Sequence, residues 1–343
     1  MERMMNFALR GSLAVVLFLP AVAPALSEVC TTQSQMISTD RDALAKAAMD
    51  LAGSVQAGEA AALRTASVAE VGKDFAAISE VVGSTAPKLK GGTLAVDQIY
   101  LLDASTLKRN ADGSATDAQF YCTLNRSVAE ADFLIPALPS GKYAFAVVEV
   151  QGLPAPWRLS FLLRQEQGRW LMAGLYPKAL TAAGHDGLWY WTQARQMVTR
   201  KEPWSAWLSY QEAETLLQPA GFVQSTHLEK LRTEATSAVP PALAEGITAD
   251  APLVIKAKDG TEYRFTSLGV DDSLGNPSID IAARLKVDAG GDQAAARKRN
   301  IAAMSALLAT HPELRKPFQG VWIFADAVGQ SPYATEQAMS DIP

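Results

Sequence analysis

Apolar side chains recur every three or four positions from Asp40 to Val82, which is the spacing of one face of an α-helix. Gly58 and Gly72 lie inside this stretch and predict interruptions of the helix. The segment 83–92 has three glycines and a proline, and it ends the pattern. We therefore expect the first part of the chain to be helical, in more than one piece.

Beyond residue 92 the pattern changes to short runs with the period-two alternation of β-strands. In the run 157–164 every second side chain is large and apolar, which predicts one buried face and one wet face. Gln165–Gly168 is typical of a hairpin connection after this run. The predicted strands are Leu94–Leu102, Ala118–Leu124, Tyr143–Val150, Trp157–Arg164 and Arg169–Tyr176.

This order of elements, helices first and then an antiparallel sheet closed by the hairpin Trp157–Tyr176, resembles the NTF2-like superfamily of SnoaL-like, cystatin-like α+β proteins. The resemblance covers about residues 40–176. It implies a cone-shaped sheet wrapped on helices, with a pocket that serves isomerases and dehydratases in some members and binding or assembly in others. Because one fold hosts such different functions, the resemblance does not choose between them.

Catalytic members of that superfamily place a histidine or an aspartate inside the cone as a general base. No histidine lies between Cys30 and Gly184, so the candidate catalytic residues are Asp97 and Asp103 on the first predicted strand. Burial raises the pKa of a carboxyl group, which suits a base. Asp103 also begins the sequence Asp-Ala-Ser, in which the carboxylate commonly caps a turn. The sequence is compatible with both roles for Asp103, catalysis and turn capping.

Aromatic side chains are concentrated in the same region. An aromatic-lined cavity suits an apolar or ring-containing ligand, and the alternative is that these rings simply fill the core. The candidate ligand-binding residues are Tyr100, Tyr121, Tyr143, Trp157, Trp170 and Tyr176.

The stretch Gly184–Trp191, GHDGLWYW, places a His-Asp pair before three aromatic residues. Asp186 stands where a helix N-cap would, because a helical apolar pattern begins at Leu188. Adjacent helical residues point in different directions, so His185 and Asp186 do not form a proton relay as they stand. The stretch predicts the start of a helix.

Residues 188–219 resemble one tetratricopeptide-type helical hairpin. A single hairpin cannot bury both of its faces, so it needs another surface to pack on. A further helix is predicted at Phe222–Ala235. The small and aromatic positions of the repeat are Ala194, Ala206, Tyr210 and Ala213, and the candidate partner-binding residues are Trp204 and Trp207.

The Pro-, Ala- and Ser-rich segment 236–251 is predicted to be a linker. The elements expected beyond it, a small β-β-β-α-β module, are Leu253–Ala257, Glu262–Leu268, Ile279–Val287, Gln293–Ala309 and Gly320–Ala325. The expected fold class is therefore α+β. Its parts are a signal peptide (1–27), an NTF2-like α+β domain (28–182), a helical hairpin extension (183–235), a linker (236–251) and a small α+β domain (252–343).

Two arginines precede the apolar run Ser12–Leu19 and small residues follow it, which is the pattern of a secretory signal peptide cleaved after Ala25 or Ser27. The run is shorter than the about 20 residues that a membrane-spanning helix needs. We expect an exported protein, periplasmic or secreted, without stable membrane insertion after cleavage. An uncleaved anchor and a lipoprotein attached at Cys30 are the alternatives.

The formal net charge is −5, and it becomes −6 without residues 1–27, so no broad basic surface is expected for a phosphate backbone. The basic cluster at 297–299 lies in a predicted amphipathic helix and suits a solvated face. The sequence contains no G-x-S-x-G, Walker-type or G-x-G-x-x-G motif. Nucleic acid is therefore not an expected partner.

The two cysteines, Cys30 and Cys122, can pair in an oxidising compartment; alternatively Cys122 is a small buried hydrophobe and Cys30 is free. Two cysteines and three scattered histidines form no local zinc or iron motif. Asp271 and Asp272 lack the pattern of an EF-hand loop and suit a solvated turn. We expect a disulfide, no metal and no cofactor.

The function that fits these features best is binding without turnover, of a small apolar ligand in the cone or of a protein partner on the hairpin. The alternative is an isomerase, dehydratase or hydrolase that uses Asp97 or Asp103 with Tyr100 or Tyr121. A third possibility is an envelope scaffold with no small ligand.

Overall fold

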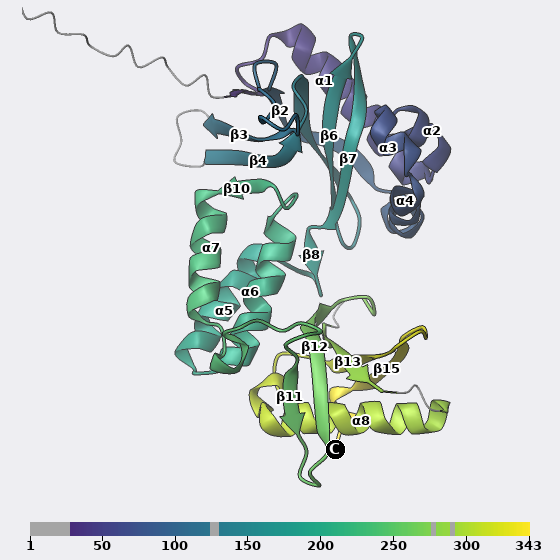
Figure 1. Cartoon of the computed structure of the whole chain (residues 1–343), viewed down its shortest axis with the longest axis vertical. Helices are drawn as coiled ribbons and strands as arrows, with labels where there is room; N and C mark the ends of the chain where they lie inside the picture. Colours follow the sequence, from purple (N-terminus) through teal and green to yellow (C-terminus); the bar gives the residue numbers. More distant parts are fainter. Residues whose placement is uncertain (1–27, 124–129, 276–278, 289–291) are drawn as a thin grey trace, which may run out of the picture.

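The computed structural model describes residues 28–123, 130–275, 279–288 and 292–343 (Figure 1). The predicted signal peptide lies outside the described residues. The chain is mixed α+β, as expected, with sheets whose strand pairs are mostly antiparallel. In Figure 1 one sheet with helices α1–α4 lies at one end, helices α5–α7 follow, and a second sheet with α8 lies at the other end.

Four helices follow the first strand. Gly58 ends the first of them with a φ of 73°, which glycine adopts without strain, so this predicted interruption is confirmed. The last of these helices continues to Leu89, into the segment 83–92 that was predicted to end the helical part. It continues because Val82 and Leu89 are buried in a core against the sheet. These elements are β1 (Val29–Thr32), α1 (Ser38–Ala57), α2 (Ala60–Thr65), α3 (Ala69–Lys73) and α4 (Ala76–Leu89).

The main sheet has the order β1-β2-β5-β6-β7, with all its pairs antiparallel. Along β6, Leu159, Phe161 and Leu163 point into a core with helices α1, α2 and α4. Arg158 and Ser160 take the other parity, but that face is not wet as predicted: Ser160 is buried, because a second, three-stranded sheet covers this side. The strands are β2 (Thr93–Asp103), β5 (Lys142–Gln151), β6 (Trp157–Glu166) and β7 (Arg169–Ala179), at four predicted positions.

A three-stranded sheet, ordered β10-β4-β3, packs on the face of the main sheet that the helices leave free. It contains β3 (Thr116–Thr123), which was predicted, and β4 (Glu130–Leu138) and β10 (Val223–Ser225), which were not. The rings of Phe120, Phe133 and Phe145 are buried between the two sheets.

A disulfide joins the two sheets. Cys30 on β1 and Cys122 on β3 are bonded, with their Cα atoms 5.4 Å apart, so the predicted pairing is confirmed. A parallel bridge between Glu28 and Phe120 lies beside it. The first described residues are therefore fixed to both sheets.

Helices α5 (Gly187–Thr199) and α6 (Pro203–Leu217) form the predicted hairpin, and α7 (Thr226–Ser237) follows β10. A two-stranded ribbon, β8 (Thr181–Ala182) and β9 (His185–Asp186), leads into α5. The Asp186 carboxylate accepts a hydrogen bond from the Trp189 backbone N at 2.8 Å, so the N-cap prediction is confirmed. The His185 ring stacks on Trp189, with centroids 3.8 Å apart.

The C-terminal sheet follows sequence order, β11-β12-β13-β14-β15. Strands β13 and β14 are parallel, which requires the crossover helix between them. The β-β-β-α-β order is confirmed, and β15 is an edge strand that the sequence pattern did not predict. The elements are β11 (Leu253–Lys256), β12 (Glu262–Asp271), β13 (Asp280–Val287), α8 (Gln293–Thr310), β14 (Gly320–Ala327) and β15 (Tyr333–Ala338).

Helices α5 and α6 share one hydrophobic core with this C-terminal sheet. The Trp204 ring, 5% exposed, packs on the His311 ring at a centroid distance of 3.9 Å. Leu243, within the predicted linker, is buried in the same core, so part of that segment is packed. Among the described residues, no helix has the length and apolar character to cross a membrane.

Candidate functional site

A pocket of about 490 Å³ lies where the main sheet, the smaller sheet and helices α5–α7 meet. Its volume is within the range of small-molecule sites, and most of its wall is apolar. The apolar wall includes Phe133, Phe145, Val147, Trp191 and Leu217, and the polar groups include Asp97, Tyr100, Arg158 and His227.

Asp97 reaches this pocket because β2 has a bulge at this residue. Val96 pairs with Val148 and Gln98 pairs with Val147, so Asp97 is the extra residue between the two pairs. Strict alternation would place Asp97 on the face of Ile99, which is buried against the helices. The bulge instead leaves the carboxylate exposed at the wall of the pocket.

The carboxylate of Asp97 is free to bind. Partial burial and then the charge of Glu149 raise the pKa of Asp97, while Arg158 lowers it. Within the described part of the chain, no hydrogen bond or ion pair holds this carboxylate.

Arg158 is the partly buried cation of the pocket. Its Nη2 donates to the Leu216 carbonyl at 3.0 Å, at the C-terminal end of α6, where the helix dipole favours a positive charge. Its Nε is shielded from water and has no hydrogen-bond partner among the described residues. Burial lowers the pKa of Arg158, and Asp97 and Glu149 oppose that shift. A buried donor without a partner is uncommon in a folded protein.

Arg158 belongs to a row of charges that crosses the sheet. Its cross-strand neighbours are Glu149 on β5 and Lys178 on β7. Burial and then the charge of Arg158 lower the pKa of Lys178. Together with Asp97 the row contains two acidic and two basic side chains, so its formal charges cancel.

Tyr100 and Trp191 are aromatic residues of the pocket wall, and contacts with neighbouring side chains hold both in place. Burial, with a contribution from Asp97, raises the pKa of Tyr100 to about 12, so its hydroxyl stays protonated at neutral pH. The Tyr100 ring packs edge-on against Phe133 at 5.1 Å. The Trp191 Nε1 donates to Glu234 at 2.7 Å, which fixes the indole.

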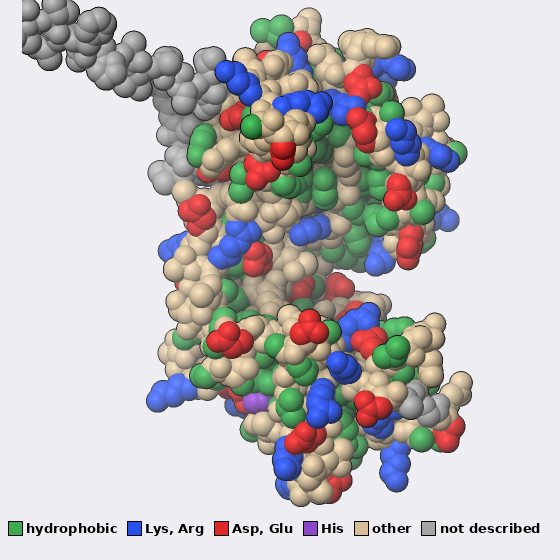
Figure 2. Space-filling view, in the orientation of Figure 1, with side chains coloured by type: hydrophobic (Ala, Val, Ile, Leu, Met, Phe, Trp, Pro, Cys, Tyr) green, Lys and Arg blue, Asp and Glu red, His purple; other side chains and the backbone are tan. Residues whose placement is uncertain are grey.

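The six aromatic residues predicted to bind a ligand do not converge on one cavity. Of these six, Tyr100 alone lines the pocket described above. Trp157 lines a separate cavity of about 400 Å³ between α4, the start of β6 and the loop after β12, on the side where Figure 2 shows a hollow. Trp170 and Tyr176 pack against the two cores of the main sheet, and Tyr121 is 59% exposed on β3.

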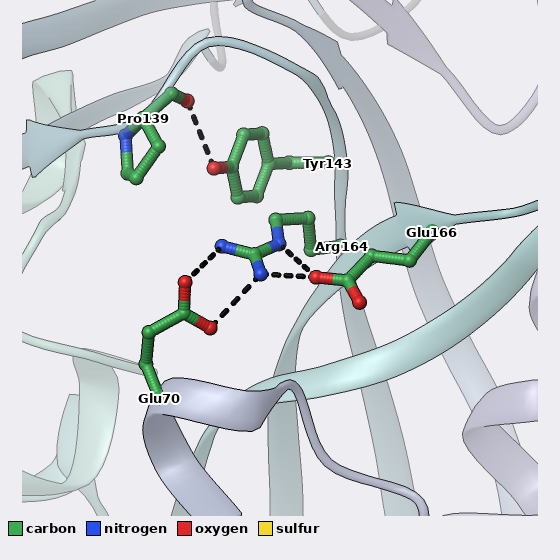
Figure 3. A network of polar contacts seen from close by, with 5 residues as sticks. All are labelled: Glu70, Pro139, Tyr143, Arg164 and Glu166. Carbon is green, nitrogen blue, oxygen red and sulfur yellow. Dashed lines mark hydrogen bonds and ion pairs between the residues drawn. The ribbon is translucent and has the colours of Figure 1, made fainter.

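Tyr143 is a core and loop residue rather than part of a pocket. It is buried, and its hydroxyl donates to the Pro139 carbonyl at 2.8 Å (Figure 3). Beside it, Arg164 on β6 donates to both carboxylate oxygens of Glu70, at 3.3 and 2.9 Å, and to Glu166. This network fastens α3 to the sheet.

The remaining candidates make contacts within the chain. Asp103 accepts a hydrogen bond from the Ser105 backbone N at 2.9 Å, which is the turn-capping arrangement, and it does not line the pocket. Trp204 is buried against His311 of the same chain, with Trp207 packed edge-on beside it. The surface that the hairpin needs is therefore the C-terminal module of its own chain.

Sequence reasoning did not single out the residues that complete the pocket, namely Phe133, Arg158, Trp191 and His227. Arg158 gave a usable signal, because it is a charged residue in a strand with many apolar residues, on the parity opposite to Leu159 and Phe161. The others come together from β4, α5 and α7, and no local spacing relates them.

No family model, curated protein or solved structure matches this chain. The pocket is therefore interpreted from its own geometry. In the part of the chain that the structure describes, no group of three or more His, Cys, Asp or Glu side chains could hold a metal ion.

Proposed function

We propose that this protein is an exported binding protein that takes a small, largely apolar ligand, without turnover, into the pocket between the main sheet and helices α5–α7. The observation that carries the proposal is the composition of the pocket wall, which is mostly apolar but includes the Arg158 guanidinium and the Asp97 carboxylate, which has no partner among the described residues. A ligand that lays its apolar body on Phe133 and Phe145 and offers an acceptor to the Arg158 guanidinium would fit this wall.

Export and the NTF2-like resemblance are part of the same proposal. The basic and apolar N-terminal pattern and the Cys30–Cys122 disulfide support export, because disulfides persist in oxidising compartments. The order of four helices followed by an antiparallel sheet supports the resemblance. Helices α1–α4 fill one face of the sheet as core, so the proposed pocket uses the opposite face.

The test is a titration of the full chain with Nile red, a neutral apolar dye. Ala131 lines the pocket and is partly buried, so Ala131→Trp fills part of the volume and is expected to weaken dye binding at least tenfold. Leu134→Trp is the matched control, since Leu134 lies on the same strand and is 47% exposed on its outer face. Equal dye binding by the two variants would contradict the pocket assignment.

A second candidate function is catalysis with Asp97 as the general base of an isomerase, dehydratase or hydrolase. The observation that favours it is the raised pKa of Asp97 in a pocket that also holds the Tyr100 hydroxyl. Asp97→Asn separates the two candidates, because it removes the base and keeps the pocket. Catalysis predicts loss of turnover at unchanged dye binding.

A further inference from the structure

Two opposite charges face the same pocket without forming an ion pair. Asp97 on β2 and Arg158 on β6 both line it, and no ion pair joins them in the described ranges of the chain. Strand β5 lies between β2 and β6, so the two backbones are roughly 10 Å apart at strand spacings of about 4.8 Å. The two side chains attract each other through space and keep free hydrogen-bonding groups.

A ligand with a single charge fits this arrangement poorly. A carboxylate alone would be attracted by Arg158 and Lys178 and repelled by Asp97 and Glu149. An ammonium group alone would meet the reverse pattern. A molecule that carries one charge of each sign, close together, satisfies both partners and leaves the local charge balanced.

We infer that the occupant of this pocket is a free α-amino acid with a large apolar side chain, its carboxylate on Arg158 and its ammonium group on Asp97. This inference rests on the proposed function of the pocket. The side chain of the amino acid lies along Phe133, Phe145 and Val147, which are buried and line the same pocket. The Tyr100 hydroxyl, protonated at neutral pH, is a further polar group in the same wall.

The dimensions agree with this assignment. In an α-amino acid the ammonium nitrogen and the carboxylate carbon are about 2.5 Å apart, because both are bonded to Cα. One charge-assisted hydrogen bond of about 2.8 Å at each end brings the span to roughly 8 Å. Strands β2 and β6 have one strand between them, so their side chains can present two polar groups at a span of this order.

The experiment is isothermal titration calorimetry of the full chain with four probes. L-phenylalanine carries both charges, N-acetylphenylalanine lacks the ammonium group, phenylalaninamide lacks the carboxylate, and N-acetylphenylalaninamide lacks both. Phenylalanine is expected to bind most tightly. Removal of either charge is expected to weaken binding about 10- to 100-fold, the factor that one charge-assisted hydrogen bond provides.

Variants assign each charge to its partner. Arg158→Gln is expected to bind phenylalanine and phenylalaninamide equally, and Asp97→Asn to bind phenylalanine and N-acetylphenylalanine equally. The controls are Arg164→Gln, on the same strand as Arg158 but paired with Glu70, and Asp103→Asn, on the same strand as Asp97 but at a turn. Both controls are expected to keep the probe preferences of the unmodified chain.

The outcomes separate this inference from the proposed function. Binding of N-acetylphenylalaninamide or N-acetylphenylalanine as tight as that of phenylalanine would overturn the amino-acid assignment and leave the pocket proposal standing. If Nile red binds and none of the four probes does, the amino-acid assignment is likewise overturned and the pocket proposal stands. If neither the probes nor the dye binds, the proposed function itself fails. The four-probe comparison uses the unmodified chain, so an unstable variant does not prevent the test.

Discussion

Glu212 shows how one buried side chain links stability to pH. It lies on α6, 9% exposed, and it faces Asp271 and Asp272 at the end of β12. Burial and then the charges of Asp272 and Asp271 raise the pKa of Glu212 from 4.5 to about 7. The folded chain therefore holds this proton more tightly than the unfolded chain does. Because of this group, stability falls as the pH rises from about 4.5 through 7.

Glu212→Gln is expected to raise the free energy of unfolding at pH 8 by up to about 3 kcal/mol, since each unit of pKa shift is worth about 1.4 kcal/mol. At pH 4 the two proteins should differ little. Urea denaturation at pH 4, 6 and 8 measures this. Glu214→Gln is the control, because Glu214 lies on the same helix and pairs with Arg232. A gain that is the same at every pH would refute the explanation.

For single residues, the predictions that were confirmed depend on neighbouring residues or on the number of cysteines. The capping role of Asp186 follows from the residues next to it, and the chain has two cysteines that can pair only with each other. The face of Asp97 could not be read from alternation, because a bulge is a property of the pairing between two strands. Counting alternate positions back from Ile99 would place Asp97 on the helix-covered face, which is not where the structure places it.

At the scale of elements, helices α5 and α6 approach each other closely at Gly187. A Cβ at this position would lie 2.6 Å from the Leu217 Cγ and 3.0 Å from the Ala213 carbonyl oxygen, which is backbone and moves little. Gly187→Ala is therefore expected to destabilise the protein by about 1–3 kcal/mol. Gly53, inside α1, has open space around it, so Gly53→Ala is expected to stabilise by about 0.5–1 kcal/mol.

Thermal unfolding of both glycine variants checks this pair of expectations. Shifts of the same sign would mean that the close approach of the two helices does not constrain Gly187.

Long periodic elements were predicted well, and short strands with weak patterns were not. β6 and β7 are rich in large apolar residues and are joined by a hairpin turn. β4 contains a proline and lacks strict alternation, and it takes its conformation from pairing with β3 and β10. β15 buries a threonine where alternation rules look for a large apolar residue.

For the whole molecule, the α+β class and the order of its parts could be anticipated from composition and periodicity. The packing of helices α5 and α6 into the core of the C-terminal sheet could not. That packing depends on which apolar surfaces meet in space, and both the N-terminal sheets and the C-terminal module have apolar surface.

The Cys30–Cys122 disulfide ties β1 to β3 across 92 positions of sequence. Replacing both cysteines by serine is expected to cost about 4 kcal/mol, because the unfolded chain regains the entropy of the opened loop. Hydrogen exchange should show lost protection in β1 and β3 and unchanged protection in β11–β14. Equal loss of protection in β1, in β3 and in the C-terminal sheet would mean that the bond stabilises the chain as one unit.

The pocket wall comes from two hydrophobic cores at once. Phe145 belongs to the core between the two N-terminal sheets, and Trp191 belongs to the core shared with the C-terminal sheet. A ligand bound between these two cores stabilises the state in which they are packed together. At a free concentration of a hundred times its Kd, this stabilisation is about 2.7 kcal/mol. In the proposed binding protein, ligand binding therefore strengthens the packing of helices α5–α7 against the main sheet, and this effect rises with the ligand concentration.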